Sequence, residues 1–116
     1  MVEVFGITNC DTVKKAVNWL KDHHISFVFH DFKKEGISHA DLEDWINRLT
    51  LDKVLNKKST TYRSLDPLDQ KRLENKRSAI KVMQEQTSLI KRPVIVKKEV
   101  LLNGFDETKY SSLLLK

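Results

Sequence analysis

The first 32 residues switch their hydrophobic period twice, and this switch constrains the fold more than any other feature of the sequence. Residues 2–6 alternate and are rich in β-branched and aromatic types, which predicts a short strand. Apolar side chains then recur at the spacing of one helix face, at Val13, Ala16, Val17 and Leu20. The aromatic-rich residues 26–32 predict a second strand. A strand–helix–strand unit of this kind requires parallel strands and a right-handed crossover.

The rest of the chain predicts several helices, a hairpin and a final helix. Two predicted helices have clear starts, with Ser38 as one N-cap and Asp66-Pro67 as the other. The helices are expected over 38–49, 66–75, 78–86 and 106–115. Strands at 94–96 and 100–102 flank the turn Lys97-Lys98-Glu99. Residues 33–36 are expected to form a loop, and residues 51–66 are polar with little periodicity.

This order of elements predicts an α/β fold with one four-stranded mixed sheet and helices on both of its faces. The predicted helical insertion, about residues 38–86, lies between the second and third strands. A chain of 116 residues fits one compact domain, expected to span residues 1–116. No internal repeat or interdomain linker is visible.

Composition narrows the class of protein. The chain is 40% hydrophobic and 32% charged, which excludes disordered and low-complexity classes. Its apolar runs are too short for a transmembrane helix, and its start lacks the pattern of a signal peptide. We therefore expect a cytoplasmic protein without membrane association, and a monomer.

The net charge of +5 comes from basic residues that are mixed with acidic ones along the chain. This pattern is typical of a solvated surface; it allows an anionic partner but does not require one. Direct nucleic-acid binding is not expected, because the sequence has no helix-turn-helix spacing, zinc pattern or RNA-binding aromatic signature.

Cys10 is the only cysteine in the sequence. A single cysteine excludes an intramolecular disulfide and a cysteine-based zinc site of the ordinary kind. The four histidines do not form a metal site either, because His23 and His24 are adjacent and point in different directions, while His30 and His39 fall in different predicted elements. We expect no bound metal.

The position of Cys10, directly after a strand and before a helix, suggests a reactive thiol. Backbone amides at a helix N-terminus lack intrahelical partners, and the helix dipole places partial positive charge there. Both effects lower the pKa of a thiol, and Lys14, one turn later, adds a positive charge. The alternative is that Cys10 is a small buried apolar residue.

The run Lys91-Arg92-Pro93 comes just before the third predicted strand. Proline cannot join a central ladder, so Pro93 belongs at the strand entrance. Two interpretations stay open from the residues alone: an ordinary trans proline beside two solvated cations, or a cis bond.

Four segments spread over nearly the whole chain form a set. In chain order they are residues 4–16, the polar run 56–63, residues 88–94, and residues 103–106 together with Tyr110. In this order and spacing they resemble the ArsC family, specifically its YffB-like branch, which is related to the Spx and MgsR regulators. The resemblance implies a thioredoxin-like fold with a helical insertion between strands 2 and 3. It also implies a reactive Cys10, a cis Pro93 lying against Cys10, and an Arg92 that reaches the same pocket.

The chain departs from two relatives of this family at positions that carry function. Arsenate reductases of the family have arginine four residues after the nucleophile, where this chain has Lys14. Of their further arginines, one corresponds to Arg92, and the other two fall near Asn56 and Asn103. Spx regulators usually carry a second cysteine three residues after the first, at the position of Val13.

These features predict a thiol oxidoreductase in which Cys10 attacks an oxidised thiol substrate and glutathione or glutaredoxin supplies the second thiol. Glutathione is then a co-substrate, and no bound cofactor is expected. The predicted catalytic residues are Cys10, Lys14 and Arg92. Lys14, Lys91 and Arg92 are candidates to bind the carboxylates of glutathione. The other predicted substrate-binding residues are Thr8, Asn9, Thr12 and Pro93.

Two alternatives remain. The first is an Spx-like regulator that binds a protein partner, such as RNA polymerase, through the helical insertion. The second is a true arsenate reductase.

Overall fold

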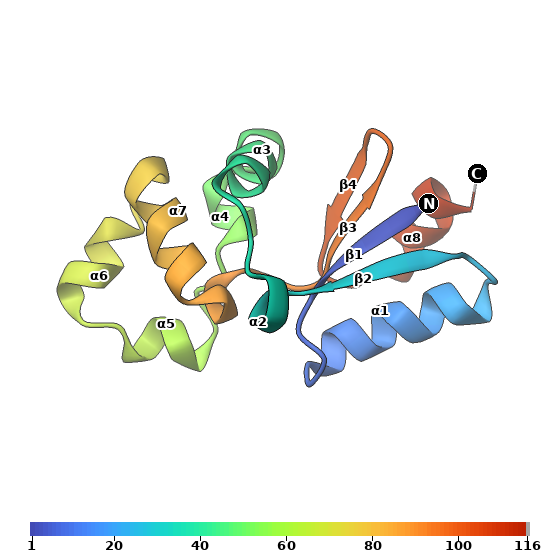
Figure 1. Ribbon diagram of the computed structural model, residues 1–116, viewed down its shortest axis with the longest axis horizontal. Helices are drawn as coiled ribbons and strands as arrows, with labels where there is room; N and C mark the ends of the chain where they lie inside the picture. The colour runs from blue at the N-terminus through green and yellow to red at the C-terminus, as the bar shows by residue number, and fades with distance from the viewer. Residues whose placement is uncertain (116) are drawn as a thin grey trace. The chain divides into compact units, whose positions relative to one another are not determined.

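The computed structural model describes residues 1–115, which form two compact units. The first, which we call the sheet unit, contains residues 1–35 and 92–115. The second, the helical unit, contains residues 36–91. Along the chain, the helices α3–α7 of the helical unit come after strand β2 and before strand β3, and Figure 1 labels each of them.

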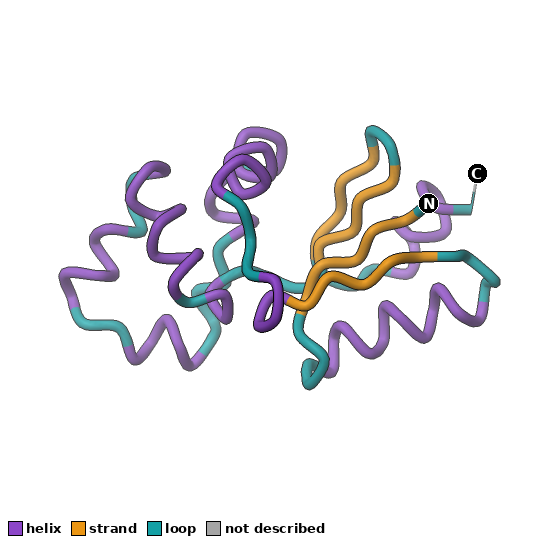
Figure 2. The backbone as a smooth tube through the Cα atoms, in the orientation of Figure 1, coloured by secondary structure: helices purple, strands orange, loops and turns teal. Residues whose placement is uncertain are grey.

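The sheet has four strands in the order β2-β1-β3-β4 (Figure 2). Their bounds are β1 Val2–Gly6, β2 Phe27–Asp31, β3 Val94–Lys97 and β4 Val100–Asn103. β1 pairs parallel with β2, as the predicted crossover requires, and β3 runs antiparallel to both of its neighbours. The predicted four-stranded mixed sheet is confirmed.

The core of the sheet unit lies between the sheet and two helices, α1 (Asp11–Asp22) and α8 (Glu107–Leu114). It is formed by Val2, Val4, Ala16, Trp19, Leu20, Ile95, Tyr110 and Leu114. Trp19 of α1 meets Tyr110 of α8 edge to face, with 5.4 Å between the ring centroids.

The prediction of helices on both faces holds only through the short helix α2 (Phe32–Glu35), whose Phe32 ring stacks on Phe5 with 6.5 Å between centroids. The two long helices of this unit pack together on the other face of the sheet. Strand alternation explains which face they cover, because Val2 and Val4 point to the side that holds Ile95. The opposite side of β1 and β2 carries Glu3, Phe5 and His30, a mixture of polar and aromatic side chains.

The helical unit contains five α-helices and one 3₁₀ turn. Their bounds are α3 His39–Leu49, α4 Leu51–Val54, α5 Thr60–Ser64, α6 Pro67–Arg72, α7 Lys76–Glu85 and η1 Thr87–Leu89. The predicted caps are confirmed: Ser38 accepts a hydrogen bond from the amide of Asp41, and Asp66 accepts one from the amide of Asp69. None of the helices described over residues 1–115 has both the length and the hydropathy that a membrane span requires.

Three short helices were not predicted. α4 and α5 lie in the polar stretch 51–66, and α2 (Phe32–Glu35) covers most of the predicted loop 33–36. Local polar contacts hold two of them. The Ser59 hydroxyl accepts from the amide of Tyr62 at the start of α5, and the buried Asp31 accepts from the amide of Lys33 in α2. Helices as short as these have no periodic spacing of apolar residues from which they could be predicted.

Candidate active site

Cys10 lies between β1 and α1 and is the N-cap residue of α1. Its backbone is extended, and its carbonyl accepts the first helical hydrogen bond from the amide of Lys14 at 3.0 Å. Strand and helix approach closely here: a Cβ on Gly6 would lie 2.9 Å from a methyl group of Val13. This local structure places the Cys10 residue at the N-terminus of a 12-residue helix.

Opposing effects act on the Cys10 thiol. Burial raises its pKa, but the amide of Val13, the Arg92 side chain and the amide of Thr12 each favour the thiolate. Their combined effect is larger, so the pKa of Cys10 lies below its usual value. The predicted direction is confirmed.

The cation that lowers this pKa is Arg92, which hydrogen-bonds to the sulfur and also acts on it through its charge. From the sequence, Lys14 was expected to supply this charge. Lys14 is instead an exposed residue on α1, one turn beyond the sulfur. That Lys14 binds a carboxylate of the substrate stays a prediction.

Arg92 comes from the chain just before β3. The Arg92–Pro93 peptide bond is cis, as the family resemblance implied. Pro93 is buried, its carbonyl accepts a hydrogen bond from the amide of Gly104 at 2.9 Å, and the Nε atom of Arg92 is buried as well. The backbone around Arg92 is therefore fixed within the sheet unit. A direct contact between Pro93 and Cys10 stays a prediction.

The other predicted substrate-binding residues differ in their surroundings. Thr8 and Asn9 are exposed in the turn before Cys10, and Thr12 is half-buried with its amide acting on the sulfur. Lys91 is the last residue of the helical unit, where its amide donates to the carbonyl of Val54 at 2.8 Å. Its part in the site stays a prediction.

Gly104 and Tyr110 belong to a segment that the sequence singled out without assigning a role to either residue. The Tyr110 hydroxyl donates to the carbonyl of Gly104 at 2.6 Å, and Gly104 in turn contacts Pro93. Nothing in the local sequence reports this link, because Pro93 and Gly104 face each other only once β3 and β4 have paired.

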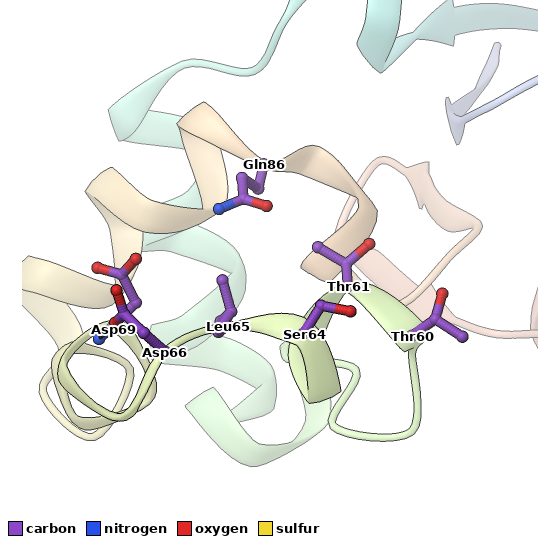
Figure 3. A pocket seen from close by; sticks show the side chains of 7 residues that line it. All are labelled: Thr60, Thr61, Ser64, Leu65, Asp66, Asp69 and Gln86. Atoms are coloured by element: carbon purple, nitrogen blue, oxygen red, sulfur yellow. Dashed lines mark hydrogen bonds between the residues drawn. The ribbon is translucent and has the colours of Figure 1, made fainter.

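A hollow lies in the helical unit, lined mainly by hydroxyl, carboxylate and amide side chains. Figure 3 shows side chains of α5 and α6 around it, and its lining comprises Thr60, Thr61, Ser64, Leu65, Asp66, Asp69 and Gln86. Its two carboxylates serve local structure: Asp66 caps α6, and Asp69 pairs with Arg72 at 3.1 Å. Over residues 1–115, no group of His, Cys, Asp and Glu side chains could hold a metal ion. The candidate centre for chemistry is Cys10, because of its position at the start of α1 and the lowered pKa of its thiol.

Comparison with known proteins extends these observations. The sequence profile of the ArsC family matches residues 5–113. A Haemophilus influenzae protein, itself uncharacterized, is 41% identical over 97% of both chains. The global transcriptional regulator Spx 1 of Oceanobacillus iheyensis is 27% identical, over 92% of this chain and 82% of its own length.

Solved structures agree with the fold. The YFFB (PA3664) protein superposes with a TM-score of 0.94 at 38% identity, over 98% of this chain and 99% of its own. An arsenate reductase (ArsC) related protein from Brucella melitensis gives a TM-score of 0.74 at 37% identity, over 97% and 93% of the two chains. A glutaredoxin from Archaeoglobus fulgidus, at 17% identity and a TM-score of 0.50, shares the thioredoxin-like fold alone. By its sequence profile, its fold and the cysteine that follows its first strand, this chain belongs to the ArsC family.

Proposed function

We propose that this protein is a thiol oxidoreductase that depends on glutathione or glutaredoxin and uses Cys10 as its nucleophile. One observation carries the proposal: Cys10 lies at the N-terminus of α1, where two amides and Arg92 lower its pKa. The thiolate is the reactive form of cysteine, so a lowered pKa raises the reactive fraction near neutral pH.

The first step is attack of the Cys10 thiolate on the glutathione sulfur of a mixed disulfide between glutathione and a substrate thiol. A bond forms between Cys10 Sγ and the glutathione sulfur, while the original disulfide bond breaks. The electron pair of that bond leaves on the substrate sulfur, which takes up a proton and is released as a thiol.

The second step regenerates the enzyme. Cys10 is the only cysteine in the sequence, so the resolving thiol comes from outside. A second glutathione, as its thiolate, attacks the glutathione sulfur bound to Cys10. Oxidised glutathione leaves, and the Cys10 thiolate returns. Overall, the glutathionylated substrate and one glutathione yield the free substrate thiol and oxidised glutathione.

Glutathione carries two carboxylates, and the site offers cations for them. Arg92 already lies at the sulfur, and Lys14 is exposed on the first turn of α1. We assign carboxylate binding to these two residues and to Lys91. Hydrogen-bond donation to the tripeptide comes from Thr8, Asn9 and Thr12, and Pro93 forms part of the binding surface.

The test is turnover of a glutathionylated peptide, coupled to NADPH through glutathione reductase. We expect turnover by the natural chain and none by Cys10→Ser. Lys14→Gln should raise KM for glutathione several-fold, whereas Lys15→Gln, its exposed neighbour, serves as the matched control and should change KM little. Turnover that persists in Cys10→Ser would refute the proposal.

A regulator that binds a protein partner is a second candidate, because the chain matches the Spx 1 regulator over 92% of its length. In that case the helical unit, with exposed cations such as Lys57 and Lys58, forms the interface. Cys10→Ser separates the two functions: it would retain a polymerase-binding activity and abolish an enzymatic one. Co-purification with RNA polymerase that is unaffected by Cys10→Ser, together with no turnover, would favour the regulator.

Arsenate reduction is expected to be slow or absent. Holding a tetrahedral oxyanion for attack favours planar, bidentate arginines. Of the arginines of family arsenate reductases this chain keeps Arg92, but it has Lys14 at one position and Asn56 and Asn103 near the other two. The measurement is the same NADPH-coupled assay with arsenate, glutathione and glutaredoxin. Robust turnover of arsenate that depends on Cys10 would reverse the order of these functions.

A further inference from the structure

Tyr110 on α8 carries a buried hydroxyl group with a defined partner. The residue is 1% exposed, and the hydroxyl donates to the carbonyl of Gly104 at 2.6 Å. Burial, and then the charge of Asp106, raises the pKa of Tyr110. The hydroxyl therefore keeps its proton at any physiological pH and stays a donor.

A hydrogen bond links Gly104 to the backbone segment that carries Arg92. Its φ of 76° lies in the left-handed region, and its amide donates to the carbonyl of Pro93 at 2.9 Å. The β3–β4 ladder pairs Val94 with Asn103, so the Gly104–Pro93 bond extends the pairing by one residue beyond both strands. It ends at the residue next to Arg92.

The ring of Tyr110 is held from two sides. Phe105 meets it edge to face with 5.1 Å between centroids, and Trp19 of α1 does so at 5.4 Å. These contacts leave the ring little freedom, so the hydroxyl has one position. Trp19 also belongs to the helix whose first turn supplies the amides at Cys10.

We propose that Tyr110 is a positioning residue for the Cys10 site: its hydroxyl fixes Gly104, and through the Gly104–Pro93 hydrogen bond it fixes the backbone that presents Arg92 to the sulfur. This inference rests on the proposed function, since it assumes that the Cys10 thiolate is the reacting group. It assigns Tyr110 no contact with substrate.

The test is Tyr110→Phe, which removes the hydroxyl and keeps the ring, with the pKa of Cys10 as the readout. Iodoacetamide alkylation rates measured against pH give this pKa without any substrate, so the result is independent of the turnover assay. We expect the pKa to rise by about 0.3 to 0.5 pH units, which shifts the whole alkylation profile to higher pH. An unchanged pKa would overturn the proposal.

A double-mutant cycle with Arg92→Gln tests the route. If Tyr110 acts through Arg92, Tyr110→Phe should add nothing to the pKa in the Arg92→Gln background. An equal shift in both backgrounds would show that Tyr110 acts otherwise and would refute the proposal.

The matched control is Leu114→Ala, which removes a buried side chain one turn further along α8 and leaves the hydrogen bonds of Tyr110 and Gly104 intact. It should lower the melting temperature at least as much as Tyr110→Phe without moving the pKa of Cys10. A similar pKa shift in Leu114→Ala would mark the Tyr110 effect as a general loss of packing and would overturn the proposal.

If Tyr110→Phe does not fold, Phe105→Leu serves as a second variant, because it loosens the packing of the Tyr110 ring and keeps the hydroxyl in place. We then expect a smaller rise in the pKa of Cys10. No rise in that pKa would count against the proposal.

Discussion

At the scale of single residues, the Cys10 thiol responds to contributions from two separate parts of the chain. Burial favours the neutral thiol, while the amides of α1 and the side chain of Arg92 favour the thiolate. The amides act in any chain that forms α1. Arg92 acts only when the segment before β3 is in place. Because Arg92 acts through its side chain and the others are backbone amides, a substitution can remove the contribution of Arg92 alone.

We predict that Arg92→Gln raises the pKa of Cys10 by about one unit, because a charge and a hydrogen bond at the thiolate are both weakened. Lys14→Gln is the matched control, since Lys14 is exposed and the charge that acts on the sulfur comes from Arg92. Iodoacetamide alkylation against pH measures both variants. A larger shift in Lys14→Gln than in Arg92→Gln would contradict this assignment.

At the scale of elements, a histidine joins β1, β2 and α2. Nε2 of His30 lies 3.1 Å from Glu3 on β1, and Nδ1 lies 3.0 Å from Glu35 on α2. The ring also stacks on Phe5, with 4.6 Å between centroids. Both ring nitrogens meet a carboxylate, an arrangement that suits the protonated imidazolium.

This cluster predicts a pH-dependent contribution to stability. Burial lowers the pKa of His30, but the hydrogen bonds and charges of Glu35 and Glu3 raise it by a larger amount. The pKa of His30 in the folded protein therefore exceeds the usual 6.5. The stabilisation is therefore complete below about pH 6.5 and is lost as the pH rises through the folded pKa. It should amount to about 0.5 kcal/mol, because both carboxylates are near half exposure and solvent screens them.

NMR titration of the His30 ring protons, together with melting curves between pH 5.5 and 8.5, checks this prediction. Glu35→Gln should lower the pKa of His30 and flatten the pH dependence of the melting temperature. His24→Gln, which changes an exposed histidine, is the control and should leave that dependence unchanged. If the natural chain grew more stable from pH 6.5 to 8, the raised pKa of His30 would not be its source of stability and the prediction would fail.

At the scale of the whole molecule, the groups that set the pKa of Cys10 all belong to the sheet unit. We predict that a cavity in the helical unit lowers stability without changing the thiol. Leu42→Ala removes a fully buried side chain there and should cost about 2 to 4 kcal/mol. Urea unfolding and the alkylation profile measure the two effects separately, and a shifted Cys10 pKa in folded Leu42→Ala would contradict the prediction.

The sequence predicted those parts of the molecule that leave a local pattern. Apolar spacing predicted α1 and the strands, and side-chain caps predicted the starts of α3 and α6. It did not predict α5, whose turn depends on Ser59, or the packing of α8 on the face that α1 covers. A hydroxyl contact and a choice of sheet face leave no periodicity in the sequence.

The candidate site was predicted in the same uneven way. Its position before α1 identified Cys10, because strand, turn and helix are neighbours in the chain. Periodicity could not pair Cys10 with Arg92, since these residues meet only through the completed sheet, and the family resemblance alone pointed to that pairing. The local argument chose Lys14, which is near in sequence but exposed.

The two halves of the sheet unit lie on either side of the helical unit in the chain, and this order has a consequence for biosynthesis. A ribosome delivers Cys10 early, whereas Arg92 and the strands β3 and β4 emerge only after the whole helical unit. Until that segment is synthesised, Cys10 lacks the guanidinium of Arg92, one of the groups that lower the pKa of its thiol in the folded protein. The contribution of Arg92 to the thiolate is therefore added only after the helical unit has been synthesised and β3 and β4 have paired.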